Sequence, residues 1–237
     1  MLTLNPWITI TTMTQTKITH RPITVGNSIS RRRFTSGMFG AGIALTSPFL
    51  SSATALAADD DLITHITTPR VLGDAKAPIK VVEFFSMTCG HCANFHNVTF
   101  PKVKSDMIER GLIQFEMRPF PLDGLALRGH ALARSLPTTR YFPMVKALMS
   151  QHKQWVRAED PLAALMKIAR LAGISGAEFN KIMSNRALLE KLVEMRQTAL
   201  DDWNVSSTPS FVINEDKVLS GNMNYEKFVE EINAYGA

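Results

Sequence analysis

The spacing of apolar and polar residues predicts short strands at both ends of a long helical segment. Residues 71–74 are expected to form a short edge strand and a turn. Residues 79–85 are apolar on both alternating faces, which is typical of a strand buried in the middle of a sheet. A helix is expected from Cys89 to about Arg110, bent at Pro101, with a second strand over 112–118.

Between about residues 122 and 203 the periodicity is helical. Two helix starts carry capping signals: Asp160 precedes Pro161, and Ser175 stands three residues before Glu178 in a capping box. Five helices are predicted in all: near 123–135, near 141–154, over 160–173, from 175, and one whose apolar face holds Leu188, Leu192, Met195 and Ala199.

Strand-forming sequence returns after the helical segment. Residues 210–213 and 217–219 form a predicted hairpin across a turn at 214–216, and a closing helix is expected over about 224–234. The order is strand, helix, strand, a block of helices, a hairpin and a helix. An α/β sheet domain interrupted by a helical insertion at about 122–203 fits this order best.

The first 57 residues have the layout of an export signal. The basic cluster in Ser30-Arg31-Arg32-Arg33-Phe34 precedes a weakly apolar stretch over 37–50, and Ala55-Leu56-Ala57 is suited to signal peptidase. The cluster matches the twin-arginine pattern, and an ordinary secretory signal is the alternative. A retained anchor is disfavoured because the apolar run is shorter than the roughly 20 residues that span a bilayer. We therefore predict an exported, periplasmic domain over 58–237.

Composition and charge narrow the function. The chain has 237 residues, of which 45% are hydrophobic, and a formal net charge of +5. Five of its 26 basic residues and none of its 21 acidic ones lie in residues 1–57, which leaves 21 of each sign in the domain. The basic excess therefore belongs to the predicted signal and gives no support to nucleic-acid binding. No nucleic-acid partner is expected.

The chain has only two cysteines, Cys89 and Cys92, spaced Cys-x-x-Cys. A c-type haem site would need histidine where Ala93 stands, and a zinc site would need about four ligands, usually from a second cysteine pair. A purely structural disulfide is the main alternative, but so short a loop removes little chain entropy, about 2 kcal/mol in the entropic model. A redox-active pair is the better explanation, with no metal and no cofactor other than the disulfide itself.

The predicted position of Cys89 favours reactivity. It follows a buried strand and opens a helix, where free N–H groups and the helix dipole stabilise a thiolate. Gly90 and His91 lie between the cysteines, and a protonated His91 would add positive charge. Cys92 lies one turn further along and should be more shielded. A stabilised thiolate at Cys89 is typical of an oxidising pair.

These residues resemble the thioredoxin superfamily, and specifically the DsbA-type exported oxidoreductases. The resemblance covers about residues 70–235 and implies a thioredoxin fold with an inserted all-helical domain. It is carried by the motif Cys89-Gly90-His91-Cys92 after Glu83-Phe84-Phe85-Ser86, and by Tyr141-Phe142, Gln151, Trp155, Leu171-Ala172-Gly173-Ile174 and Val205-Ser206-Ser207-Thr208-Pro209-Ser210-Phe211.

Three further site residues follow from the resemblance. Pro209 matches the family's cis-proline beside the reactive pair, which would expose the backbone of Thr208 for substrate binding; a trans proline at the start of a strand is the alternative. Glu83 matches a buried acid that exchanges a proton with Cys92, the alternative being a solvent-facing residue. His96 is expected to be an ordinary helix residue.

The resemblance implies an exported thiol–disulfide oxidoreductase that introduces disulfide bonds into cysteine-containing exported proteins. A DsbB-type membrane oxidase would reoxidise the pair, and a monomer is favoured. A disulfide isomerase or reductase is the nearest alternative, because Thr208 resembles the isomerase branch at least as well as the archetypal oxidases. A non-catalytic peptide-binding or chaperone module on the same fold is an alternative from another class.

Overall fold

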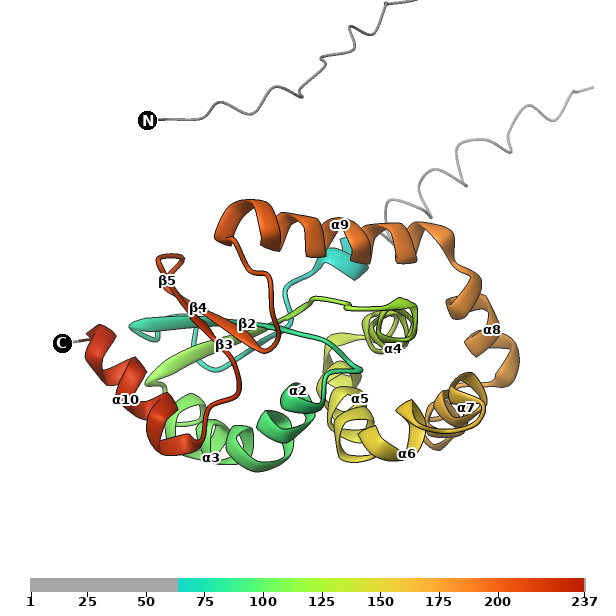
Figure 1. Ribbon diagram of the computed structural model, residues 1–237, viewed down its shortest axis with the longest axis horizontal. Helices are drawn as coiled ribbons and strands as arrows, with labels where there is room; N and C mark the ends of the chain where they lie inside the picture. The colour runs from blue at the N-terminus through green and yellow to red at the C-terminus, as the bar shows by residue number, and fades with distance from the viewer. Residues whose placement is uncertain (1–63, 237) are drawn as a thin grey trace, which may run out of the picture. The chain divides into compact units, whose positions relative to one another are not determined.

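The computed structural model describes residues 64–236, so the predicted export signal over 1–57 lies outside the described residues. Their centre is a five-stranded sheet of order β1-β3-β2-β4-β5. Strands β2 and β3 are parallel and every other pair is antiparallel (Figure 1). The strands are β1 (Val71–Leu72), β2 (Ile79–Phe85), β3 (Ile113–Pro119), β4 (Ser210–Ile213) and β5 (Lys217–Ser220). The strand order confirms that residues 79–85 are central.

Strand β2 sends alternate side chains into two separate cores. Val81 and Phe85 pack in the larger core, which includes residues from the helices on one face of the sheet. Val82 and Phe84 pack in a smaller core on the other face. Because side chains alternate along a strand, Glu83 points to the same face as Val81 and Phe85.

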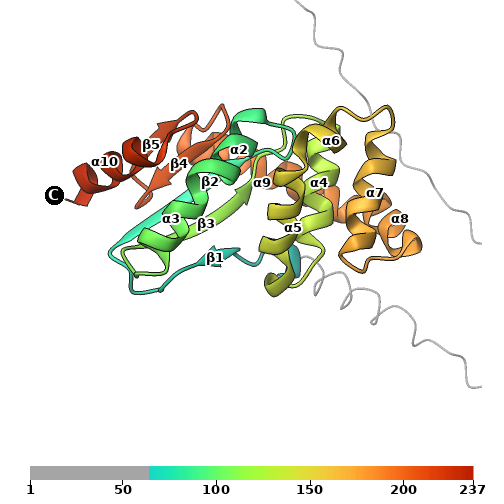
Figure 2. The same cartoon turned by 90° about the horizontal axis from the view of Figure 1, so that it is seen from below.

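Helices cover both faces of the sheet. The helix after the cysteines and α10 (Tyr225–Gly236) lie against the first face (Figure 2). The second face is covered by the end of α9 (Arg186–Trp203), whose Trp203 ring lies 5.6 Å from that of Phe84. Among residues 64–236, no helix is both long and apolar enough to cross a membrane.

The predicted helix over 89–110 is not one regular α-helix. It consists of α2 (Gly90–Asn94), a π-helical turn at Phe95–Thr99, α3 (Phe100–Val103) and a second π-helical turn at Lys104–Ile108. Pro101 has no N–H with which to continue the ladder, and the first wide turn lies directly before it, with the Phe100 N–H donating to Phe95 O.

The helical insertion is confirmed, with one difference. The segment predicted as a single helix over 141–154 forms two, because the backbone leaves the helical region at Gln151. Asp160 and Ser175 act as N-caps as predicted, each accepting from the N–H three residues ahead. The helices before α9 are α4 (Gly124–Arg134), α5 (Thr138–Ser150), α6 (His152–Val156), α7 (Pro161–Leu171) and α8 (Gly176–Ser184).

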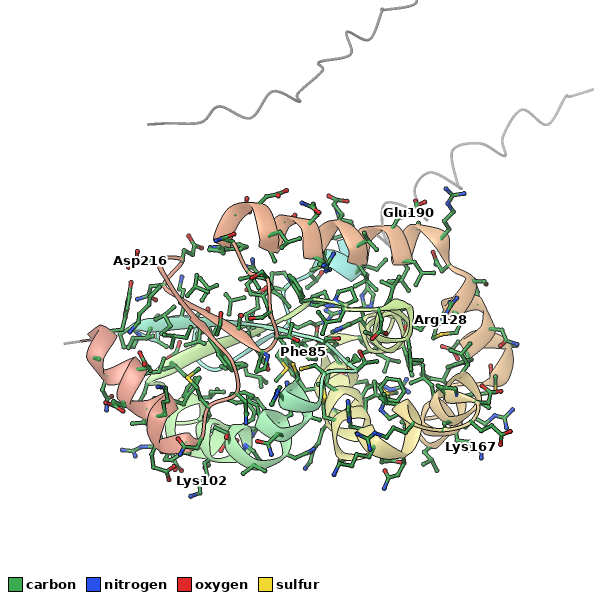
Figure 3. The ribbon with its side chains drawn as sticks, in the orientation of Figure 1. Phe85, Lys102, Arg128, Lys167, Glu190 and Asp216 are labelled. Atoms are coloured by element: carbon green, nitrogen blue, oxygen red, sulfur yellow. The ribbon has the colours of Figure 1, made fainter. Side chains whose placement is uncertain are left out.

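Helix α4 is the centre of this insertion and contacts α5, α7, α8 and α9. Phe85, at the end of β2, lies in the interior near α4, whereas the labelled charged side chains such as Lys102 and Lys167 lie at the periphery (Figure 3). The end of β2 at Phe85 is therefore enclosed by both the sheet domain and the insertion.

Two fully buried arginines join the start of the domain to the insertion. Arg134 donates to the carbonyls of Ile66, Thr68 and Met117 at 2.9–3.1 Å. Arg70 donates to Thr138 Oγ1 at 2.9 Å and to three carbonyls. Both guanidinium groups lie over the ring of Tyr141, at 5.4 Å and 5.3 Å from its centroid. Burial and the charge of Arg134 lower the pKa of Arg70.

Candidate active site

Cys89 is the N-cap of α2 and is partly exposed. Its backbone is extended, with φ −76° and ψ 118°, so the chain turns into the helix at this residue. Sγ accepts from the Cys92 N–H at 3.4 Å and donates to Thr208 O at 3.3 Å. The predicted placement of this sulfur at a helix N-terminus is therefore present in the structure.

The surroundings of Cys89 favour its ionised form. Its pKa is lowered from 9.0 to about 5, first because the Cys92 thiol donates to the sulfur, and then because of the Thr208 hydroxyl and the N–H groups of Cys92 and His91. Burial opposes this shift. The imidazole of His91 is exposed, so His91 contributes mainly through its backbone. The Cβ of a residue replacing Gly90 would meet nothing within 4 Å, so the motif is open to solvent there.

Cys92 has the opposite character. It is 0% exposed, and burial raises its pKa far above the ordinary range, with the charge of Glu83 adding to the effect. Both cysteines are present as free thiols. One sulfur is therefore stable as a thiolate and reachable from outside, while the other holds its proton and is shielded.

Thr208 and Pro209 lie beside the reactive sulfur, and the peptide bond between them is cis. Strand β4 begins at the next residue, Ser210, and pairs with β2. The resemblance implied a substrate-binding role for the backbone of Thr208 but no role for its side chain. Its buried hydroxyl has no hydrogen-bond partner among the described residues while Cys89 is a thiol, and it can turn its O–H to the thiolate.

Glu83 is buried on the face of β2 that carries the cysteine-bearing helix, with 0% of its surface exposed. Its Oε1 lies 3.0 Å from Nε2 of His96, although neither atom has a well-directed hydrogen bond. His96 is therefore buried beside Glu83, a contact that the sequence analysis, which took His96 for an ordinary helix residue, did not predict. The signal that could have found it is its spacing, since it stands four residues, or one turn, after Cys92.

The loop before Cys89 is held to the helical insertion. Thr88 Oγ1 donates to Oδ2 of Asp123 at 2.6 Å, while Oδ1 of Asp123 caps α4 by accepting from the Ala126 N–H. A Cβ on Gly129 of α4 would lie 2.9 Å from Met87 Cβ, so only glycine permits this approach. Within the described part of the chain, no group of three metal-ligating side chains is arranged to hold a metal.

One prediction concerns the Thr208 hydroxyl. Thr208→Val removes a donor to the Cys89 thiolate and should raise the Cys89 pKa from about 5 by on the order of one pH unit. Thiolate absorbance at 240 nm during a pH titration measures it, and Thr208→Ser is the control that keeps the hydroxyl. The pKa of Cys89 in the folded protein lies below the ordinary value of 9.0, so ionisation of Cys89 increasingly stabilises the reduced folded protein as pH rises from about 5 to about 9. This pH-dependent gain in the free energy of unfolding should be smaller in Thr208→Val. Equal titrations for both variants would contradict this role.

Comparison with known proteins identifies a family that the chain matches over most of the described residues. The family model described as Thioredoxin matches residues 65–234. A Rickettsia conorii protein provisionally named a protein-disulfide oxidoreductase is 30% identical over 145 residues, which are 61% of this chain and 52% of the relative. The chain thus spans about half the length of that relative.

Two solved structures share the fold. That of alpha-DsbA1 from Wolbachia pipientis is 28% identical with a TM-score of 0.65 and covers 72% of this chain and 92% of that one. That of a protein-disulfide isomerase from Novosphingobium aromaticivorans is 26% identical with a TM-score of 0.61 and covers 70% and 95%.

Proposed function

The chain belongs to the thioredoxin family as a DsbA-like protein, and we propose that it introduces disulfide bonds into exported proteins through Cys89 and Cys92. The observation that carries this proposal is the contrast between the two thiols. Cys89 lies partly exposed at a helix N-terminus with a pKa of about 5, and Cys92 is buried with a raised pKa. A purely structural pair would need no such difference.

The proposed reaction begins with the Cys89–Cys92 disulfide. A substrate thiolate attacks Cys89 Sγ, the intramolecular S–S bond breaks, and Cys92 takes up a proton because its pKa is high. A second substrate thiolate attacks the substrate sulfur of the mixed disulfide and expels Cys89 as a thiolate. Two electrons pass from the substrate to the pair. A DsbB-type membrane oxidase that accepts them is the partner we propose for reoxidation.

Thr208 and Pro209 are proposed to hold the substrate. Thr208 O lies 3.3 Å from the reactive sulfur, two residues before β4 begins. An extended peptide that pairs with this backbone would bring its own cysteine to Cys89, as in strand addition to a sheet edge. Cysteine-containing exported proteins are the substrate class this arrangement favours.

The low Cys89 pKa favours the oxidising direction. A stabilised thiolate stabilises the reduced enzyme and makes its disulfide a stronger oxidant. The value of about 5 lies between those of DsbA, about 3.5, and thioredoxin, about 7. Export is proposed from the signal-like residues 1–57, which would deliver the domain to an oxidising compartment.

Disulfide isomerisation is the second candidate. Two observations favour it: threonine stands before the cis-proline, and one of the matching structures is named a protein-disulfide isomerase. An isomerase must release substrates as readily as it oxidises them, so it works with a more reducing couple than a dedicated oxidase.

The test is the equilibrium potential of the Cys89–Cys92 couple in glutathione buffers. We expect a value closer to about −120 mV than to about −270 mV, because the Cys89 pKa lies below that of thioredoxin. Refolding of a reduced protein and of a scrambled protein, measured in parallel, separates oxidase from isomerase activity. A potential near −270 mV with no gain of native disulfides would overturn the proposal.

A further inference from the structure

The resemblance implies that the buried carboxyl of Glu83 exchanges a proton with Cys92, but it gives no role to the imidazole of His96, which lies against that carboxyl. Their 3.0 Å contact is enclosed, since the side chains are 0% and 4% exposed. The rings of Phe85, Phe95 and Phe100 lie 5.1–5.9 Å from the imidazole. A buried acid and a buried histidine in an aromatic shell are costly unless they serve a purpose.

A groove of about 600 Å³ reaches this histidine from outside. It lies between the helix that follows Cys92 and α5, with β1 and β3 contributing to its wall. Its lining includes His96, Phe100, Lys104, Met117, Phe142 and Lys146. His96 lines the groove on one side and contacts Glu83 on the other, whereas Glu83 does not line it.

Resolution of a mixed disulfide at Cys89 needs a route for one proton. Cys92 must lose the hydrogen of its S–H bond to attack, yet it is fully buried and its pKa is raised. Glu83 is near enough for its charge to contribute to that shift, but Glu83 is itself cut off from solvent. A carboxyl that accepts the proton therefore needs a partner to pass it on.

We propose that His96 is that partner: it positions Glu83 and passes the Cys92 proton to the groove. This inference rests on the proposed disulfide exchange. The Cys92 sulfur attacks the Cys89 sulfur, the mixed S–S bond breaks, and the departing sulfur leaves as a thiolate. The proton moves from Cys92 to the Glu83 carboxylate and then to Nε2 of His96. The imidazole releases a proton from its other nitrogen through the groove.

The charged groups around His96 come from each neighbouring element. Lys104 and Lys146 line the groove, and Lys104 pairs with Glu109. From α4, His130 is fully buried and packs on Phe85 at 4.9 Å; burial lowers its pKa to about 3, so it stays neutral. From α5, the buried hydroxyl of Tyr141 is close enough for the Glu83 charge to act on it.

The experiment is rapid mixing of the reduced protein with oxidised glutathione from pH 5 to pH 9, quenched with acid and analysed by mass spectrometry. The first step, in which Cys89 forms the mixed disulfide, needs only its thiolate. The second step, in which Cys92 releases glutathione, needs the proton route. We expect His96→Gln and His96→Phe to leave the first rate unchanged and to slow the second about tenfold near pH 6. The variant rates should rise steeply with pH and approach the native rate near pH 9.

His130→Gln is the matched control, because His130 is also buried against the Phe85 ring but makes no ion-pair contact with Glu83. Its pH profile should match that of the native protein. A second-step profile unchanged in both His96 variants, or changed as much in His130→Gln, would overturn the inference. Failure of the first step in the native protein would instead overturn the proposed function.

Discussion

Replacing Cys89 with serine is expected to abolish both the oxidation of a reduced protein and the reduction of insulin, by at least about a thousandfold. Serine cannot replace the thiol, because its hydroxyl is not ionised near neutral pH and can neither form a disulfide bond nor act as the leaving group when one is cleaved. The fold should survive, since position 89 is the N-cap of α2 and serine is among the best N-cap residues. Circular dichroism and urea unfolding check this directly.

Cys92→Ser provides the contrast for that experiment. It keeps the reactive Cys89 but removes the sulfur that resolves the mixed disulfide, so it should accumulate as a covalent complex with a disulfide-containing substrate. Non-reducing electrophoresis shows the complex, and a reductant should release it. Activity near the native level in Cys89→Ser, or a stable complex formed by Cys89→Ser, would refute the assignment of Cys89 as the attacking group.

The second large effect is on stability. Arg134→Met should lower the free energy of unfolding by about 3–5 kcal/mol, because the carbonyls of Ile66 and Met117 in the interior, and that of Thr68 nearer the surface, lose a charged donor that methionine cannot replace. The side chain is 0% exposed, so water cannot take over these bonds without opening the interior. Urea unfolding at pH 7, followed by circular dichroism, measures the loss.

Arg128→Met is the control from the same helix. Arg128 is only partly buried and donates a single bond, at 2.8 Å, to Met183 O. Its replacement should cost only about 1 kcal/mol. If the two variants unfold at the same urea concentration, the buried Arg134 bonds do not stabilise the fold as we infer.

The sequence patterns predicted the sheet and the insertion because both depend on local periodicity and capping. Apolar residues on both faces placed β2 at the centre, and the Asp160 and Ser175 caps located two helix starts. Cys89 at the start of a helix followed from the same logic. The π-helical turns that divide the helix after Cys89 were not predicted, because an i−5 hydrogen bond leaves no distinct spacing in the sequence.

The features that sequence analysis missed depend on contacts between distant segments. The Glu83–His96 contact joins a strand to a helix, and its closeness depends on how the two pack. Arg70 and Arg134 resemble ordinary surface arginines until their distant carbonyl partners are known. The Thr208 hydroxyl acts on Cys89 across 119 residues of chain. Tertiary packing, not local propensity, determines these three features.

The arginine contacts also imply an order of events in folding. Arg134 donates to Ile66 and Thr68, which it follows by 68 and 66 residues. The first residues of the domain are made first, but they lack their buried partner until α4 has formed. The start of the domain therefore cannot make these contacts until the chain has been made as far as α4. If the domain crosses a membrane already folded, the Arg134 contacts have formed before transport. If it crosses unfolded, these contacts must form after transport.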